Sequence, residues 1–294
     1  MAVYERTYRR YEGELTPSRA RITVLPRYAY GEILKSKLFM AFVVVCLTWS
    51  FALACVLYIP HNLGLLKIEA LGLDPEEVGR FFALWIDPNF FFRFFMWPTF
   101  FMALVVTLVV GPVLVTSDLR NNGLALYFSR PLGRAQYALG KALVLAILLS
   151  ILTWIPGFLL FLFQSYLEGF DWLRQNYRVG LGIVLGHWIW ITVLCLISLA
   201  ISAYVKWRPV ARLTLILLIF VAGGLSALTN FLLGTEWASV INISDMMLVI
   251  WANLFGVDPP VSTPAWVAWI SPVLFCLVSV WLLSRKLRPY EVVK

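Results

Sequence analysis

Long apolar stretches separated by short polar segments dominate the chain. Six of them reach the roughly 20 mostly apolar residues that a helix needs to cross a bilayer: 38–59, 94–116, 136–163, 179–205, 210–233 and 264–283. The stretches are continuously apolar, whereas strands of a membrane barrel would alternate over about ten residues. The pattern therefore predicts an all-α polytopic membrane protein with six transmembrane helices.

Composition agrees with this prediction. Hydrophobic residues make up 61% of the chain and charged residues 14%, against about 45–50% and about 25% in soluble domains. Mean hydropathy is +0.82. So few charges exclude a soluble enzyme, a disordered chain and a nucleic-acid-binding domain, although the net charge is +8.

The basic residues are divided unequally between the two sides of the predicted membrane. Of the 24 Lys and Arg residues, five fall on one side, and the segment 234–263 on that side contains none; the five are Lys67, Arg80, Arg93, Arg174 and Arg178. The positive-inside rule then places both termini in the cytoplasm. The predicted organisation is a cytoplasmic arm over 1–37, a six-span domain over 38–284 and a cytoplasmic tail over 285–294. No apolar signal-peptide region precedes residue 38.

Three segments outside the spans suggest further structure. Residues 24–37 mix apolar and basic positions, which favours an interfacial helix on the membrane surface, or else a simple basic anchor. Residues 234–263 are apolar but interrupted by Asn and Asp, which favours a short re-entrant helical pair between spans 5 and 6. In the loop 60–93, we expect the acidic residues near 74–77 to be a solvated turn and the aromatic run 81–95 to form an interfacial belt.

Catalytic motifs are missing from the sequence. The nearest approach to a phosphate-binding loop, at 135–141, lacks both the leading glycine and the final Ser or Thr. Metalloprotease and serine-hydrolase signatures are absent, so we expect no catalytic residues and no metal site. The four cysteines, in the spans, are expected to be free thiols. His187, within a span, is expected to hydrogen-bond to a neighbouring helix rather than to relay protons.

The polar loop between spans 2 and 3 carries the clearest functional signal. Over residues 117–134 it combines apolar side chains with arginines on the wet side of the membrane, which is typical of a protein docking surface. We expect Asp118 to cap a short helix there and Pro131 to end it. The alternative is a loop folded onto the bilayer. The candidate partner-binding residues are Asp118, Leu119, Arg120, Gly123, Leu124, Tyr127, Ser129, Arg130, Pro131 and Arg134.

This loop resembles that of permease subunits of ABC-2 type transporters. The matching positions are Arg120, Gly123-Leu124, Ser129-Arg130-Pro131, Arg134 and Leu139-Gly140-Lys141. The resemblance implies a coupling helix that sits in a cleft of a separate ATP-binding subunit, with two permeases and two ATPases in the transporter. It also implies a connecting helix near 24–37 and re-entrant helices between spans 5 and 6.

The sequence thus predicts an export permease of the bacterial cytoplasmic (inner) membrane, without its own ATPase site. No cofactor is expected to bind the chain directly; ATP and Mg would be held by the partner subunit. The expected partners are that ATPase, a second copy or paralogue of the permease, and the lipid bilayer, with no nucleic acid. The alternative is a non-transporting structural subunit that anchors a respiratory or envelope complex. An intramembrane enzyme is disfavoured by the missing motifs.

Overall fold

The computed structural model describes residues 21–63, 72, 74–86, 89–121, 133–261 and 263–286. These residues are helical almost throughout and contain no strand. Six helical spans are long and apolar enough to cross a membrane: Lys37–His61, Phe91–Arg120, Arg134–Glu168, Phe170–Tyr204, Arg208–Leu233 and Ala265–Lys286. Every predicted span overlaps one of them. The chain is therefore an all-α, multi-pass membrane protein, as predicted.

Several spans are built from more than one element. The α-helices are α1 (Arg21–Ile33), α2 (Lys37–Tyr58), α3 (Pro75–Trp85), α4 (Trp97–Arg120), α6 (Arg134–Leu152), α7 (Trp154–Glu168), α8 (Phe170–Tyr204), α9 (Arg208–Ile216), α10 (Ala222–Leu233), α11 (Ile243–Phe255) and α12 (Ala265–Lys286). Short 3₁₀ turns follow α2 (η1, Ile59–His61) and precede α11 (η5, Trp237–Ile241). Single π-helical turns lie before α4 (η3, Phe91–Met96) and between α9 and α10 (η4, Leu217–Val221).

The third span bends where α6 passes into α7. The backbone at Thr153 leaves the helical region, with φ −119° and ψ −92°. Pro156 follows in the first turn of α7, where its ring excludes a regular helix through this point. The next connection, from α7 to α8, turns at Gly169, whose φ of +94° is a conformation that favours glycine. Non-helical backbone at Asn176, with φ −108° and ψ 16°, adds a second kink inside α8, so Gly169 and Asn176 together turn the chain between spans 3 and 4.

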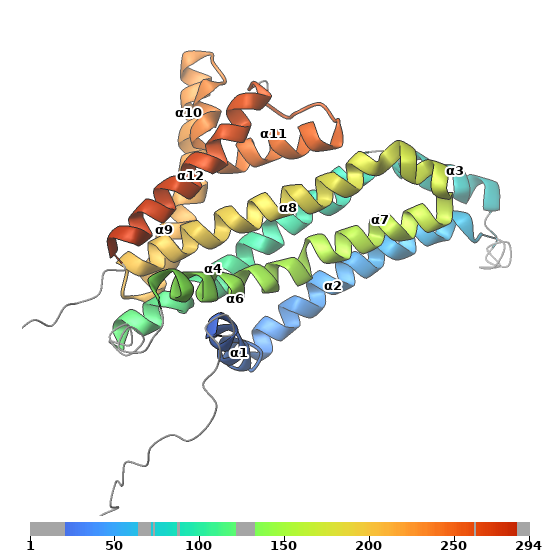
Figure 1. The fold of residues 1–294 in the computed structure, drawn as a ribbon. Helices are drawn as coiled ribbons and strands as arrows, with labels where there is room; N and C mark the ends of the chain where they lie inside the picture. Colours follow the sequence, from blue (N-terminus) through green and yellow to red (C-terminus); the bar gives the residue numbers. More distant parts are fainter. Residues whose placement is uncertain are drawn as a thin grey trace, which may run out of the picture.

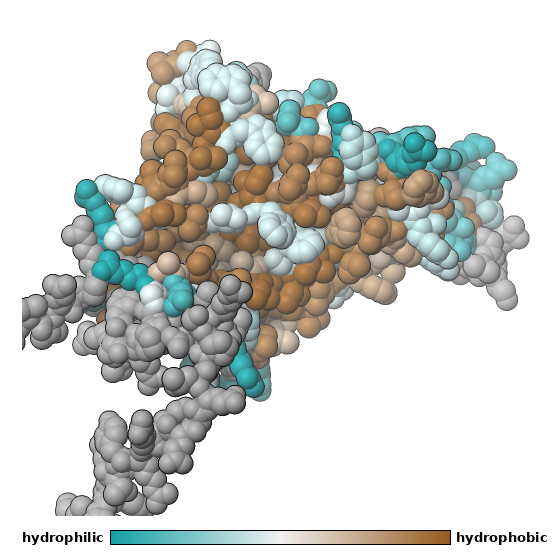
Figure 2. Space-filling model, viewed as in Figure 1, coloured by the Kyte–Doolittle hydropathy of each residue, from teal (hydrophilic) through white to brown (hydrophobic). Residues whose placement is uncertain are grey.

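The first four spans run side by side and give the bundle two distinct ends, whereas α10 and the start of α12 diverge from these four spans (Figure 1). At one end lie α1, the end of α4, the start of α6, the start of α9 and the end of α12; we call it the basic end. At the other end lie α3, the end of α2 and the turn between α7 and α8; we call it the α3 end. Apolar surface covers the visible middle of the molecule and polar residues gather towards both ends (Figure 2). This distribution is the one expected of helices that cross a bilayer.

The centre of the bundle is α8, which packs against α4, α6, α7, α11 and α12. Small residues allow the close approach. At Gly186, a Cβ atom would lie 2.3 Å from the indole ring of Trp251 in α11, so any larger residue would displace α11. Close packing at small residues is the usual means by which helices associate in membranes, because lipid is as apolar as the side chains.

Two of the expectations for the segments outside the spans are met in part. Residues 21–33 do form a helix, α1, which runs across the other helices and packs on α6 (Figure 1). Between spans 5 and 6, the chain forms η5 and then α11, an apolar helix of 13 residues. Most of the α11 side chains are buried against the bundle.

The expectation of an aromatic belt over 81–95 is wrong for its second half. Phe91, Phe92 and Phe95 are at most 8% exposed and form part of the core. Phe81, in α3, is 57% exposed. The acidic residues are solvated as expected, since Asp74, Glu76 and Glu77 are exposed, but they do not form a turn. Glu76 and Glu77 lie in the first turn of α3, and the Asp74 carboxylate caps this helix by accepting from the Glu76 N–H over 2.9 Å.

Candidate docking site at the basic end

The segment between spans 2 and 3 leaves the bundle from α4 and returns to it at α6. Helix α4 ends at Arg120, and α6 begins at Arg134 after Gly133, whose N–H donates to the Gln136 side chain over 3.0 Å. Four of the ten candidate partner-binding residues lie in these described ends: Asp118, Leu119, Arg120 and Arg134. The other six lie outside the described residues: Gly123, Leu124, Tyr127, Ser129, Arg130 and Pro131.

A buried ion pair joins the two ends of this segment. The Lys141 ammonium lies 2.8 Å from Asp118 Oδ2, and the two side chains are 11% and 14% exposed. The Tyr137 hydroxyl donates to the same carboxylate oxygen over 2.6 Å. Tyr137 is fully buried, and its ring lies 5.7 Å from the Lys141 ammonium. One carboxylate on α4 thus holds two side chains from the first two turns of α6.

The expectation that Asp118 caps a short helix is wrong. Asp118 lies in the last turn of α4, where a negative charge is unfavourable to the helix dipole. The charge is instead compensated across the bundle by Lys141. The sequence offered one indication, a lysine seven residues inside an otherwise apolar helix, but the spacing alone does not identify its partner. Asp118 thus holds α4 against α6, a role that the sequence did not predict.

A cavity of about 620 Å³ opens beside this ion pair. It is lined by two residues of the α4 end, Leu119 and Arg120, and by the turn that starts α9, over 206–209. The two polar connections at the basic end, which are 86 residues apart in sequence, therefore meet in space. Arginine and lysine side chains dominate the polar part of the lining.

Helix α1 is attached to the same end of the bundle by a tyrosine. The Tyr30 hydroxyl donates to the Val144 carbonyl of α6 over 3.0 Å. Burial raises the pKa of Tyr30 to about 12, and proximity to Cys195 adds to the rise, so the phenol stays neutral and remains a donor at physiological pH. This contact connects α1 to α6, the helix that begins at the end of the connection between spans 2 and 3.

His187 lies at the centre of the bundle, away from both ends. Its Nδ1 lies 2.8 Å from the Ile183 carbonyl and its Nε2 lies 3.1 Å from the Thr99 hydroxyl of α4. Phe95 and Trp251 pack against the ring. The prediction that His187 hydrogen-bonds to a neighbouring helix is confirmed.

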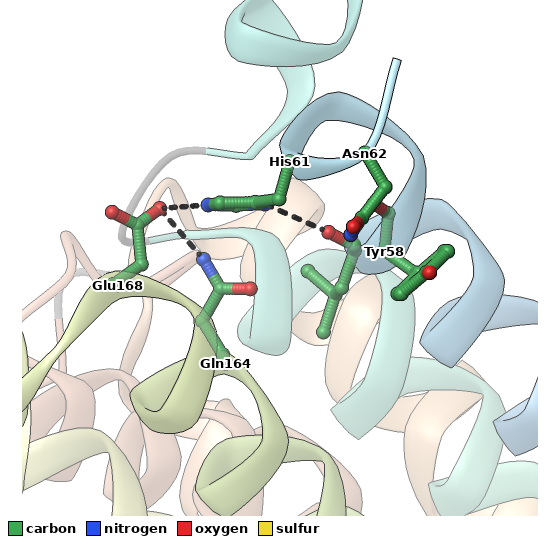
Figure 3. Close-up of polar contacts among 6 residues, drawn as sticks. Tyr58, His61, Asn62, Gln164 and Glu168 are labelled. Carbon is green, nitrogen blue, oxygen red and sulfur yellow. Dashed lines mark hydrogen bonds and ion pairs between the residues drawn. The ribbon is translucent and has the colours of Figure 1, made fainter. Parts of the chain in front are cut away.

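A second polar cluster, at the α3 end, was not predicted. His61 Nε2 lies 3.2 Å from Glu168 Oε1, and Gln164 donates to the same oxygen over 3.1 Å (Figure 3). His61 Nδ1 also lies 3.1 Å from the Leu57 carbonyl. The cluster joins the end of span 1 to the end of span 3. His61 and Glu168 are 107 positions apart, so the sequence pattern does not predict their contact.

The thiols are placed differently from one another. Cys46 and Cys195 are buried, Cys276 is partly buried and Cys55 is exposed on α2; all four are free. Among the described residues there is no group of three or more His, Cys, Asp or Glu side chains arranged to hold a metal ion.

No protein-family model matches this chain, and no curated protein matches it in sequence.

Proposed function

We propose that the protein is the membrane-spanning permease subunit of an ATP-binding cassette transporter of the ABC-2 type. In this proposal a separate ATPase subunit docks on the segment 117–134, and the basic end faces the cytoplasm of a bacterial cell. The chain then has no ATPase site of its own, and ATP and Mg are held by the partner. A second permease copy or a paralogue completes the assembly.

The observation that carries the proposal is the attachment of the docking segment to two spans at once. Asp118 and Lys141 join the α4 end to α6 across 2.8 Å. A rigid-body push on the segment would therefore move α4 and α6 together instead of bending a loop. Movement of packed helices as a unit is how ligand-driven switches reach a distant site.

Two further features are consistent with the proposal. Helix α1 precedes span 1 in the chain, where the proposal expects a connecting helix, and η5 and α11 lie in the chain between spans 5 and 6, where it expects a re-entrant pair. The excess of basic residues at the docking end agrees with a cytoplasmic location. Substrate would be exported by alternation of the bundle between inward- and outward-facing states.

The test is purification of the tagged full-length protein from its native membrane in a mild detergent, followed by mass spectrometry. We expect an ATP-binding subunit in a stoichiometric amount. Gly123→Arg and Tyr127→Asp should reduce its recovery by about tenfold without affecting membrane insertion. Tyr166→Asp is the matched control, because Tyr166 is 84% exposed near the end of α7, at the α3 end.

Two results would overturn the proposal. One is a set of redox or envelope proteins with no ATPase, which would support a structural subunit of a respiratory or envelope complex. The other is an ATPase whose recovery falls equally in Tyr166→Asp, which would place the docking surface elsewhere.

A further inference from the structure

The cavity at the basic end has a chemical character that ATPase docking does not explain. Three cationic side chains line it: Arg120 from the end of α4, and Lys206 and Arg208 from the turn before α9. None of the three forms an ion pair with a described residue. Three cations around one space, with no acidic partner in the described part of the chain, favour an anionic ligand.

The first turn of α9 adds to the positive potential of the cavity. Helix α9 begins at Arg208 with Pro209 in its first turn, and no side chain caps its N-terminus. Arg208 and Pro209 both line the cavity, so the positive end of the helix dipole lies at its wall. A phosphate group is an anion that such an arrangement binds well. A volume of about 620 Å³ is within the range of small-molecule sites.

The surface next to the cavity is apolar and continues along α9 to the start of η4. Val210 is 43% exposed, Leu213 is 57% exposed and Leu217 is 56% exposed. Trp207, in the cavity wall, is 72% exposed, a placement typical of tryptophan at the level of lipid headgroups. A charged cavity that borders an exposed apolar helix face matches a ligand with an anionic head and a hydrocarbon tail. An acidic protein segment would pair with the cations of the cavity but would leave the exposed apolar face of α9 uncovered.

We propose that this cavity is a binding site for the phosphate headgroup of an anionic phospholipid, with one acyl chain lying along α9. The phosphodiester would be held by Arg120, Lys206 and Arg208, beside Trp207. Anionic lipids are concentrated where basic residues flank the spans, on the cytoplasmic face. The site does not depend on the ATPase, so it goes beyond the function proposed above.

The test compares two double variants of the purified full-length protein by native mass spectrometry. Lys206→Gln/Arg208→Gln removes two cavity charges and leaves Arg120 in place. Lys35→Gln/Lys37→Gln removes two exposed charges from the same end that do not line the cavity. With equal amounts of phosphatidylglycerol and phosphatidylcholine, we expect the wild type to retain phosphatidylglycerol. The cavity variant should bind it about tenfold more weakly, and the control should bind it as the wild type does.

A second measurement uses the unaltered protein, so it does not depend on variants that fold. Phosphatidylglycerol with a photoreactive group in one acyl chain should cross-link to the segment 210–217. Cross-linking spread evenly over the exposed helices, without enrichment on α9, would overturn the proposal. So would equal loss of lipid in both double variants, which would indicate attraction by bulk charge.

Two other occupants are separated by the same samples. If an equal concentration of inorganic phosphate displaces the lipid completely, the ligand is a free anion and the lipid assignment is wrong. If the cavity variant keeps its lipid but loses the ATPase in the pull-down, the cavity holds an acidic segment of the partner. Retention of the ATPase together with loss of the lipid supports the site and leaves the proposed function intact.

Discussion

The basic end and the α3 end of the bundle each contain a contact between a basic and an acidic side chain, and the two contacts differ in exposure. The contact at the α3 end is an ion pair only when His61 is protonated. At the basic end, Asp118 and Lys141 are 14% and 11% exposed and lie 2.8 Å apart. At the α3 end, His61 and Glu168 are 25% and 37% exposed and lie 3.2 Å apart. Breaking a buried pair leaves an unsolvated charge, whereas water replaces a lost partner at the surface. The two ends should therefore respond very differently to loss of one charge.

A third pair extends the comparison to full exposure. Arg80 and Glu76, one turn apart in α3, are both 78% exposed at a separation of 3.1 Å. The three pairs have similar distances and differ in burial, and the His61–Glu168 pair differs also in needing a protonated histidine to be ionic. The experiments below follow this series, from the largest expected effect to the smallest.

Lys141→Met should have the largest effect. It leaves the Asp118 carboxylate buried without its cation, which costs about 3–5 kcal/mol of stability. The thermal unfolding midpoint of the detergent-purified protein measures the loss. The double variant Asp118→Asn/Lys141→Met should recover most of it, because no buried charge remains. A double variant as unstable as the single one would show that the lysine stem, and not the ion pair, stabilises this end.

Tyr137→Phe should have a smaller effect at the same end. It removes one hydrogen bond to the Asp118 carboxylate but leaves Lys141 in place, and hydrogen bonds to charged groups contribute about 1.5–3 kcal/mol. The same unfolding midpoint measures it. In the Lys141→Met background the Tyr137 hydroxyl is the remaining partner of the carboxylate among the residues that the structure describes, so the loss there should be greater. If the stability losses of Tyr137→Phe and Lys141→Met simply added in the double variant, the two side chains would not be coupled through the Asp118 carboxylate.

Glu168→Gln tests the pair at the α3 end. The amide retains an oxygen that accepts from Gln164 and removes only the charge, so the expected loss is about 1 kcal/mol or less. High salt should reduce the difference between wild type and variant at this end, because the pair is partly exposed to solvent. A loss as large as that of Lys141→Met would refute the ordering by burial.

Glu76→Gln should have the smallest effect, at most a few tenths of a kcal/mol. Exposed pairs one helical turn apart contribute about 0.3–0.5 kcal/mol and are screened by salt. The unfolding midpoint should be unchanged within error. Asp74→Ala is a useful contrast in the same helix, because it removes the N-cap of α3 and should cost about 1 kcal/mol.

The number and approximate limits of the spans could be predicted from the sequence. The thickness of a bilayer sets the length of an apolar helix, and the chain has six runs of that length. What hydropathy could not predict is which spans are central. In the most apolar 18-residue part of each span, 67% of the residues are buried in the spans that contain α4 and α8, but only 17% in the fifth span. The mean hydropathies of these parts are 2.3, 2.2 and 2.2, so hydropathy does not separate them.

The reason is that lipid and protein core are equally apolar environments. Phe95 is of a residue type common in the aromatic belts of membrane proteins, but it is fully buried and packs against His187 in α8. The contacts between Asp118 and Lys141, and between His61 and Glu168, likewise depend on which helices become neighbours. A periodic pattern in a single sequence does not contain that information. The polar connection between spans 2 and 3 could be located from its composition, but the cavity that the end of α4 forms with 206–209 could not.

The lysine seven residues inside α6 also has a consequence for biogenesis. A lone cation entering the membrane during synthesis is costly, about 2.5–3.5 kcal/mol at the centre of a helix and less towards its end. The chain is made in order, so α4 with its carboxylate reaches the membrane before α6 does. Asp118 is then available to Lys141 as α6 enters, and the charges of these two side chains can be inserted as a neutral pair. Helix α4 thus supplies the counter-charge that lowers the cost of inserting α6.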